Sequence, residues 1–241
     1  MDASLVPAER LANEHRQPWP GESDDYAAAR AALLREEIEL RRHLERVAEQ
    51  RRHLPPGPAI FKNYRFLDEN GSEVGLAELF GQHDTLISYS WMYGPDRARP
   101  CPMCTNFLGP LDQNARDIEE KAALVVVGRS TVERQKAFAQ ERGWRHLRFV
   151  QAKDDAFPHD FRSLVPAWDG SGEEWEVPSL VVFRKDGDQV RLFWSGEFNM
   201  DMADPGQDPR GAPDMAPLWN MLDITPAGRG SEWYPKLSYA D

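Results

Sequence analysis

Cysteine is scarce in this chain, with 2 among 241 residues. This excludes a small protein held together by a framework of several disulfides. The two residues are Cys101 and Cys104, with Pro102 and Met103 between them. A thiol pair at this spacing can close a small disulfide ring, so one site could alternate between dithiol and disulfide.

Long hydrophobic runs are also lacking, and no stretch approaches the roughly 20 apolar residues needed to span a bilayer. Residues 1–10 lack the basic and apolar segments of a secretory signal. We therefore predict a cytoplasmic protein without membrane association. In the cytoplasm a single C-x-x-C pair is more often redox-active or metal-binding than a permanent structural bridge.

Positive charge is in deficit, since 29 Lys and Arg face 40 Asp and Glu for a net charge of −11. Such a chain would repel phosphate backbones, and no basic stripe interrupted by aromatic residues is present. We predict that nucleic acid is not a partner.

The first 57 residues have the pattern of an N-terminal extension. Residues 1–23 are polar and contain three prolines, which is typical of an arm on the surface. Residues 24–53 have apolar positions near a period of 3.6 opposite a charged face, which predicts an amphipathic helix capped by Asp24. Its apolar face would either pack on its own domain or pair with a second copy in a homodimer. Residues 55–58 contain three prolines and end the helix.

Residues 58–241 alternate between strand and helix patterns, which is typical of an α/β domain. Apolar runs without polar alternation indicate strands that are buried on both faces. We expect strands at residues 64–67, 73–74, 85–93 and 123–128, and helices at residues 76–80, from the thiol pair to about 121, and at 130–142.

Val177 and Pro178 introduce a second motif, in which an apolar strand starting at Pro178 turns at residues 185–188 into another strand. Proline is tolerated at the start of a strand, so this segment predicts an antiparallel hairpin. Residues 151–175 and 199–217 are expected to be long inserted loops, and loops of such length often cover a site.

Cys101 is placed to cap the helix that follows it, with Pro102 at the first helical position, where a missing N–H costs nothing. Free backbone N–H groups and the helix dipole would then lower the pKa of the Cys101 thiol. Cys104, one turn later, could resolve a mixed disulfide on Cys101. We expect Arg97 and Arg99, in the preceding loop, to be solvated.

The order of these features between about residue 60 and residue 200 resembles the thioredoxin fold, a central mixed sheet with flanking helices. The resemblance implies that Pro178 is a cis-proline facing the thiol pair and that Pro110 kinks the helix after Cys104. It also implies that the backbone of Val177 pairs with an extended substrate segment.

A closer similarity is to a mostly bacterial, thioredoxin-like family catalogued as domain of unknown function eight-nine-nine. The similar features span nearly the whole chain and include the helical prefix, residues 64–66, 76–80, 91–95, 142–144 and 222–229. This family implies no established substrate, so the resemblance implies a function only through the relation to thioredoxins.

Two departures limit what the resemblance implies. The buried acidic residue that thioredoxins keep near their thiols has no counterpart on the strand at 85–93, where Ser88 and Ser90 are the small polar residues. Ala98 and Gly94 occupy the positions of the threonine and proline that precede the reactive cysteine of peroxiredoxins, which disfavours peroxidase activity of that type.

We therefore predict a thiol–disulfide oxidoreductase with Cys101 and Cys104 as catalytic residues and no other cofactor or bound metal. Its partners would be a disulfide in a protein or small molecule and an unknown electron donor. Trp168 and Trp175 are candidates for lining a substrate groove next to Val177 and Pro178. Two alternatives stay open: a non-catalytic binding protein with the same fold, and a soft-metal carrier, since two thiolates are half of a zinc site.

Overall fold

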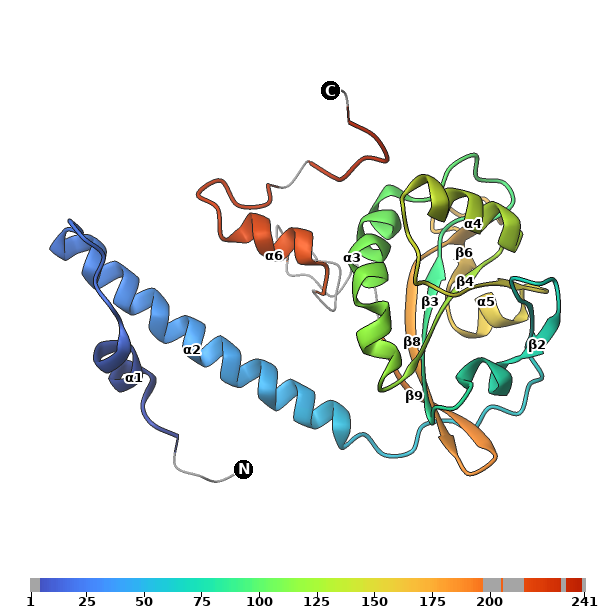
Figure 1. Cartoon of the computed structure of the whole chain (residues 1–241), viewed down its shortest axis with the longest axis horizontal. Coiled ribbons are helices and arrows are strands. Elements are labelled where there is room, and N and C mark those ends of the chain that lie inside the picture. Colours follow the sequence, from blue (N-terminus) through green and yellow to red (C-terminus); the bar gives the residue numbers. More distant parts are fainter. Residues whose placement is uncertain (1–4, 197–204, 206–214, 231–232, 240–241) are drawn as a thin grey trace. The chain divides into compact units, whose positions relative to one another are not determined.

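The computed structural model describes residues 5–196, 205, 215–230 and 233–239 (Figure 1). The chain divides into two compact units, Met1–Pro55 and Pro56–Asp241. Within the described residues no helix is both long enough and apolar enough to cross a bilayer.

The first unit contains two packed helices, α1 (Ala8–His15) and α2 (Asp24–Arg52). α1 lies in the segment for which we predicted an arm on the surface, and the prediction did not include this helix. α2 begins one residue earlier than predicted: the hydroxyl of Ser23, and not the side chain of Asp24, accepts a hydrogen bond from the N–H of Tyr26 at 3.2 Å.

The exposed face of α2 carries leucines. No residue of this helix is buried, and Leu33, Leu40 and Leu44 are 52%, 58% and 60% exposed. Whether this face pairs with a second copy stays a prediction.

The second unit is built on a seven-stranded mixed sheet with the strand order β2-β1-β5-β4-β3-β8-β9. β3, β4 and β5 are parallel, and the remaining neighbours are antiparallel. The strands are β1 (Arg65–Leu67), β2 (Glu73–Gly75), β3 (Thr85–Trp91), β4 (Ala123–Gly128), β5 (Phe149–Ala152), β8 (Ser179–Asp186) and β9 (Gln189–Gly196). The mixed sheet with flanking helices confirms the predicted thioredoxin-like fold class.

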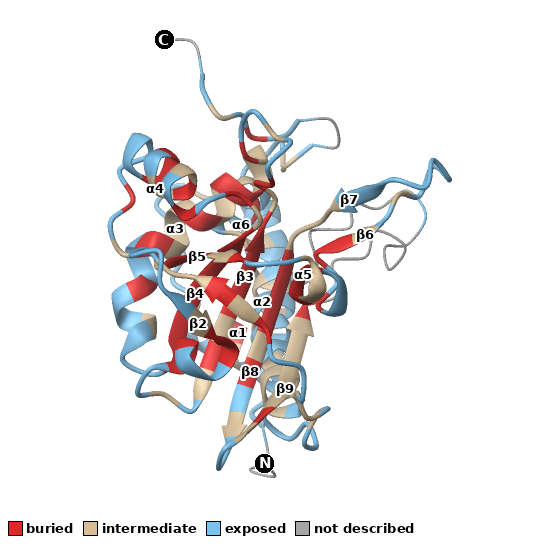
Figure 2. Ribbon diagram, turned by 90° about the vertical axis from the view of Figure 1, so that its right-hand side faces the viewer, coloured by how far each residue is buried: buried red, intermediate tan, exposed pale blue. Residues whose placement is uncertain are grey.

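Helices cover both faces of this sheet, and a separate two-stranded hairpin lies beside it (Figure 2). The helices are η1 (Leu76–Phe80), α3 (Pro102–Glu119), α4 (Val132–Glu141) and α5 (Ala156–Asp160), and the hairpin is β6 (Leu164–Pro166) with β7 (Glu174–Glu176). A further helix, α6 (Pro217–Asp223), contacts α3. η1 is a 3₁₀ helix.

Alternate residues of β4 point to opposite hydrophobic clusters, because successive side chains of a strand face opposite sides of the sheet. All six residues of β4 are buried. Val125 and Val127 belong to a cluster with η1 and α5, whereas Leu124 and Val126 belong to a cluster with α3 and α4. This double burial explains the continuous apolar run in the sequence.

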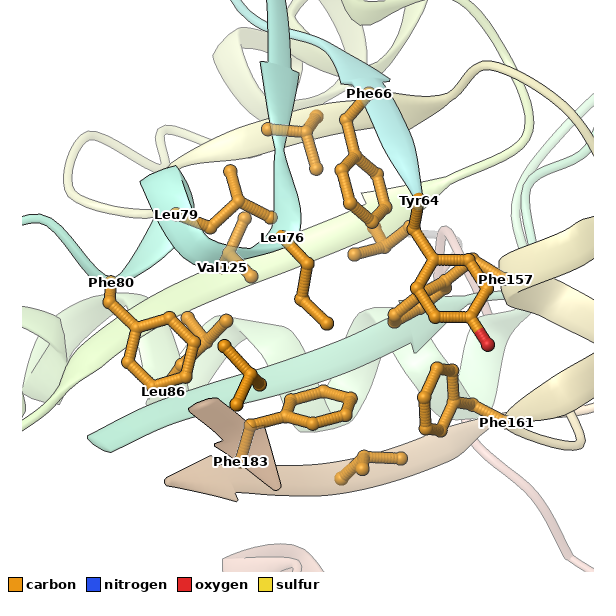
Figure 3. Close-up of a cluster of buried hydrophobic side chains, with 14 of the residues drawn as sticks. Tyr64, Phe66, Leu76, Leu79, Phe80, Leu86, Val125, Phe157, Phe161 and Phe183 are labelled. Atoms are coloured by element: carbon orange, nitrogen blue, oxygen red, sulfur yellow. The ribbon is translucent and has the colours of Figure 1, made fainter. Parts of the chain in front are cut away.

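Aromatic rings fill the cluster on the η1 and α5 side. Figure 3 shows rings gathered from β1, α5 and β8, with the Phe66 and Phe157 centroids 5.1 Å apart and those of Phe161 and Phe183 4.9 Å apart. Edge contacts of this kind add to the free energy of burial. The opposite cluster contains Cys104, so the thiol pair lies on the α3 side of the sheet.

Residues 151–175 are not the long loop that we expected. They hold the end of β5, all of α5 and most of the β6–β7 hairpin. These elements were missed because each is only three to five residues long and too short for a clear period. The other expected loop, 199–217, lies mostly outside the described residues.

A buried carboxylate joins α3 to the segment before β5. Asp112 is completely buried, and its Oδ1 accepts hydrogen bonds from the N–H groups of Arg145, His146 and Leu147 at 2.9, 2.8 and 3.1 Å. It lies eight residues after Cys104 on the same helix, about 12 Å along the axis. Its environment is therefore that of a structural anchor.

Candidate functional site

The loop after β3 delivers Cys101 to the N-terminus of α3. Cys101 is the N-cap residue and Pro102 the first helical residue, as predicted. The Cys101 N–H donates to the Met92 carbonyl at 3.1 Å, and the Cys101 carbonyl accepts from the Thr105 N–H at 3.0 Å. Both cysteines are free thiols; Cys101 is half-buried and Cys104 is buried.

The pKa of Cys101 is lowered to about 6. The largest cause is a hydrogen bond from the Cys104 thiol, and the backbone N–H groups of Cys104 and Met103 contribute further. The positive charge of Arg97 also favours the thiolate, whereas burial opposes it. At neutral pH the Cys101 sulfur is therefore largely ionised.

The neighbouring thiol has the opposite tendency. Burial is the main reason that the pKa of Cys104 is raised well above that of an ordinary thiol, and the adjacent Cys101 adds to the effect. The hydroxyl of Tyr89, on β3, hydrogen-bonds to Cys104 and partly favours its thiolate. One sulfur is thus prepared for attack while the other keeps its proton.

The pairing of β3 with β8 brings the Val177–Pro178 segment toward the thiols. Ser90 pairs with Ser179, so continuing this antiparallel register places Pro178 opposite Trp91 and Val177 opposite Met92. Met92 is the residue whose carbonyl holds the Cys101 N–H. Pro178 directly precedes β8, which begins at Ser179, and is not its first residue. The cis geometry stays a prediction.

The backbone of Val177 is already engaged. Its N–H donates to the Ser163 carbonyl at 3.0 Å, which extends the antiparallel pairing of β6 with β7 by one residue. A substrate strand that paired with the Val177 N–H would have to displace this bond. The predicted pairing with an extended substrate is therefore obstructed in this structure by the chain's own hairpin.

A cavity of about 530 Å³ lies beside this segment. Three of the predicted substrate-binding residues, Val177, Trp168 and Trp175, line it, and the two indole rings form an edge contact with centroids 5.5 Å apart. Pro178 and the cysteines are not among its lining residues, but Met92 and Arg97 from the loop before Cys101 are.

A charged network, which we did not predict, also faces the cavity. The Glu176 carboxylate is only 9% exposed, and its Oε2 accepts from the Gly94 N–H at 3.0 Å and from Arg97 Nε at 2.9 Å. Its Oε1 lies 3.6 Å from Arg129 Nη1 and has no hydrogen-bond partner among the described residues. Arg129 in turn pairs with Asp155 at 2.7 Å.

The two loop arginines are bound to partners, which corrects the expectation that they are merely solvated. Arg97 binds Glu176, and Arg99 pairs with Glu141 while its guanidinium lies 4.8 Å from the centroid of the Phe138 ring. Of the two, Arg97 influences the thiols electrostatically.

Arg134 of α4 fixes the loop that carries these groups. Its Nη1 donates to the carbonyls of Gly94 and Pro95 at 3.2 and 3.3 Å, and its Nη2 donates to that of Arg97. The guanidinium also lies 4.4 Å from the centroid of the Tyr93 ring. The wall of the cavity nearest to Cys101 is therefore held in place.

Protein groups that could complete a metal site around the thiols are few. Across the described part of the chain, no three His, Cys, Asp or Glu side chains gather closely enough to hold a metal ion. A tetrahedral site made from Cys101 and Cys104 would need two further ligands from elsewhere.

Comparison with known proteins gives a family and a fold. The family model described as "Bacterial protein of unknown function (DUF899)" matches residues 16–239. No curated protein matches the chain.

Several solved structures share the general architecture. A peroxiredoxin matches with 9% identity and a TM-score of 0.49 over 68% of this chain and 98% of its own. Peroxidoxin BcpB from Mycobacterium tuberculosis matches with 16% identity and a TM-score of 0.43 over 58% of this chain and 85% of its own. The exposed lipoprotein thioredoxin Etrx1 from Streptococcus pneumoniae matches with 10% identity and a TM-score of 0.39 over 65% and 99%. Similarity at this level concerns the fold alone.

Proposed function

This chain belongs to the bacterial family DUF899, and we propose that it is a thiol–disulfide oxidoreductase with Cys101 as nucleophile and Cys104 as resolving thiol. The observation that carries the proposal is the placement of the two sulfurs: Cys101 is half-buried at the N-cap of α3, and Cys104 is buried one turn further along the helix. The pKa of Cys101 is lowered to about 6, whereas burial raises that of Cys104. A half-buried thiolate next to a protonated thiol is the starting arrangement for two-step disulfide exchange.

The reaction proceeds in two displacements. The Cys101 thiolate attacks one sulfur of a substrate disulfide; a Cys101–substrate bond forms, the substrate bond breaks, and the first half leaves as a thiolate. Cys104 then attacks the Cys101 sulfur, its proton passing to the departing thiolate, and the second half leaves as the Cys101–Cys104 disulfide forms. Two electrons pass from the protein to the substrate, and a dithiol reductant would restore the pair.

The burial of Cys104 supports this division of roles. Cys104 is 1% exposed, so a bulky disulfide can reach it only through Cys101. Tyr89 hydrogen-bonds to Cys104 and favours its ionisation in the second step. Arg97 favours the Cys101 thiolate in the first.

Reaction of the reduced protein with dithiodipyridine, a neutral disulfide that releases a coloured thione, tests the proposal. We expect two equivalents of thione from the wild type, one from Cys104→Ser, which keeps the mixed disulfide, and very slow release from Cys101→Ser. Mass spectrometry of the Cys104→Ser product should find one pyridylthio group on Cys101. Equal release rates for Cys101→Ser and the wild type would contradict the assignment.

The two alternatives make different predictions, one for the same reaction and one for the metal content of the purified protein. A non-catalytic binding protein predicts that both thiols react slowly and independently. A soft-metal carrier predicts metal that is retained through purification of the wild type and lost in both serine variants, which elemental analysis measures.

A further inference from the structure

An extended segment, residues 173–177, is tied to the loop that ends at Cys101. Glu176 binds this loop through two hydrogen bonds, and continuing the β3–β8 register places Val177 opposite Met92. Extended polypeptides commonly bind by adding a strand to an exposed backbone edge. The edges of this segment therefore decide whether a polypeptide disulfide can bind beside the thiols as an added strand.

One edge of this segment is already occupied by β6. The Val177 N–H donates to the Ser163 carbonyl at 3.0 Å, and at the other end the Ala167 N–H donates to the Glu173 carbonyl at 2.9 Å. Between these two bonds β6 and β7 pair residue by residue. A polypeptide could use this edge only by displacing β6.

The base of the β6–β7 hairpin resists such displacement. Phe161, Ser163 and Leu164, which lead into β6, are buried. The Ser163 N–H donates to the Pro158 carbonyl at 2.8 Å, and the Ser179 hydroxyl donates to the Phe161 carbonyl at 2.9 Å. Pulling β6 away would expose apolar side chains and break these hydrogen bonds, so the obstruction is a fixed part of the fold.

The outer edges of the hairpin are poorly suited to accept another strand. Because the Ala167 N–H points toward β7 and successive residues alternate, the backbone groups of Leu164 and Pro166 point away from β7. Leu164 is only 3% exposed, and Pro166 has no N–H to donate. On β7 the residues whose backbone groups point away from β6 are Glu174 and Glu176. Charged side chains and very short strands, here of three residues each, discourage strand addition.

From these contacts we infer that the β6–β7 hairpin restricts the oxidoreductase to low-molecular-weight disulfides, because it denies extended polypeptides a strand to pair with beside Cys101. This inference rests on the proposed function and adds the class of substrate. A compact disulfide needs no backbone pairing and has only to reach the half-buried Cys101 sulfur. The exchange is the one described above: the substrate takes up two electrons and leaves as two thiols, and the Cys101–Cys104 disulfide forms.

Three probes with the same reactive bond test the inference. Each is a mixed disulfide of mercaptoethanol with a cysteine, which stands in N-acetylcysteine methylamide, at the centre of a short linear peptide, or in the same peptide with N-methylated amides flanking the cysteine. The N-methylated amides cannot donate strand hydrogen bonds. Stopped flow measures the second-order rate at which each probe oxidises the reduced, full-length protein, and this rate is divided by the rate with dithiothreitol to remove differences in intrinsic reactivity. We expect the wild type to react with the peptide no faster than with the capped cysteine, and N-methylation to change the peptide rate by less than about twofold.

Val165, in the middle of β6 and paired with Trp175, offers a matched pair of variants. Its backbone groups point toward β7, so Val165→Pro removes a donor between the two strands and should open the edge, whereas Val165→Ala keeps the N–H and is the control. Val165→Pro should react with the unmodified peptide about tenfold faster than with the N-methylated one, because one or two backbone hydrogen bonds become available. Val165→Ala should behave as the wild type. An unchanged alkylation midpoint of Cys101 shows that the thiol site is intact in both.

The outcomes distinguish the inference from the proposed function. A wild type that reacts about tenfold faster with the unmodified peptide than with the other two probes would overturn the restriction while leaving the oxidoreductase in place, and this comparison does not depend on any variant. A folded Val165→Pro protein without the gain would also overturn it, because β6 would then not govern the choice of substrate. Failure of even the capped-cysteine disulfide to oxidise the pair would overturn the proposed function itself.

Discussion

The two sulfurs of the C-x-x-C pair differ because different groups surround them. Cys101, at the N-cap of α3, receives a hydrogen bond from Cys104 and faces backbone N–H groups and the charge of Arg97. Cys104 lies within the hydrophobic cluster between α3 and the sheet. The surroundings of Cys101 therefore favour the thiolate, and those of Cys104, three positions later, disfavour it.

The pH dependence of alkylation tests this difference. The rate of reaction of the reduced protein with iodoacetamide should rise with a midpoint near pH 6, compared with about 8.5 for an ordinary cysteine. Cys104→Ala removes the leading hydrogen-bond donor and should move the midpoint upward, whereas Cys104→Ser keeps an O–H donor and should move it less. A wild-type midpoint near 8.5 would contradict the thiolate assignment.

Sequence alone was sufficient for the local part of this site. The spacing of the thiols and Pro102 at the first helical position placed Cys101 at the helix terminus, because capping depends on neighbouring residues. Glu176 and its partners were missed, since Glu176 reaches Gly94 and Arg97 across 82 and 79 residues. The only sequence signal was an acidic residue next to Val177.

At the scale of elements, α3 and the loop before it are held by contacts with segments far away in the sequence. Asp112 binds three backbone N–H groups before β5, and the loop at Gly94 approaches Glu176 closely.

Strands with continuous or alternating apolar patterns were predicted within a few residues. α1, β5, α5, β6–β7 and α6 were not, because their short lengths give no clear period and tertiary contacts decide their structure.

Asp112→Ala should lower the free energy of unfolding by about 3 kcal/mol, since three backbone N–H groups, that of Leu147 buried and the other two partly buried, lose their acceptor. Chemical denaturation of the reduced protein measures the change. Asp117→Ala, at an exposed position of the same helix, is the control and should change stability by no more than about 0.5 kcal/mol. Equal effects would show that Asp112 does not anchor α3.

Two Gly→Ala substitutions near the site should differ in their effect on stability. A Cβ at Gly94 would lie 2.3 Å from Glu176 Oε1, so Gly94→Ala should displace the carboxylate and cost about 1–3 kcal/mol of stability. A Cβ at Gly109, inside α3, would meet Trp144 Nε1 at 3.8 Å, which is an ordinary contact. Because Pro110 follows and its ring disfavours helical backbone in a preceding alanine, the usual gain of Gly→Ala in a helix should be offset, and Gly109→Ala should change stability by less than about 1 kcal/mol. Thermal unfolding measures both, and a Gly94→Ala protein as stable as Gly109→Ala would refute the close contact.

At the scale of the whole molecule, the charge of α2 is divided along its length. Residues 24–40 contain five acidic and two basic side chains, and residues 41–52 contain five basic and two acidic ones. Two such helices running antiparallel would place opposite charges together around the exposed Leu33, Leu40 and Leu44. Such pairing would correspond to the homodimer, one of the two roles considered for the helix.

Analytical ultracentrifugation tests that role. The full chain should sediment as a dimer at low salt and dissociate in part at high salt, because exposed charge pairs are screened. Leu33→Glu together with Leu40→Glu should give a monomer whose Cys101 keeps its low alkylation midpoint. A wild-type monomer at all salt concentrations would remove the dimer from consideration.

The unequal pKa values of the two thiols also determine how many protons accompany the electrons. Below about pH 6 the reduced pair carries two protons, so its reduction potential should fall by about 60 mV for each pH step. Above that pH Cys101 is ionised and Cys104 is not, only one proton is taken up, and the slope should halve to about 30 mV. On acidification the reduction potential would rise and the dithiol would become a weaker reductant. This rise would be steeper below about pH 6 than near neutral pH.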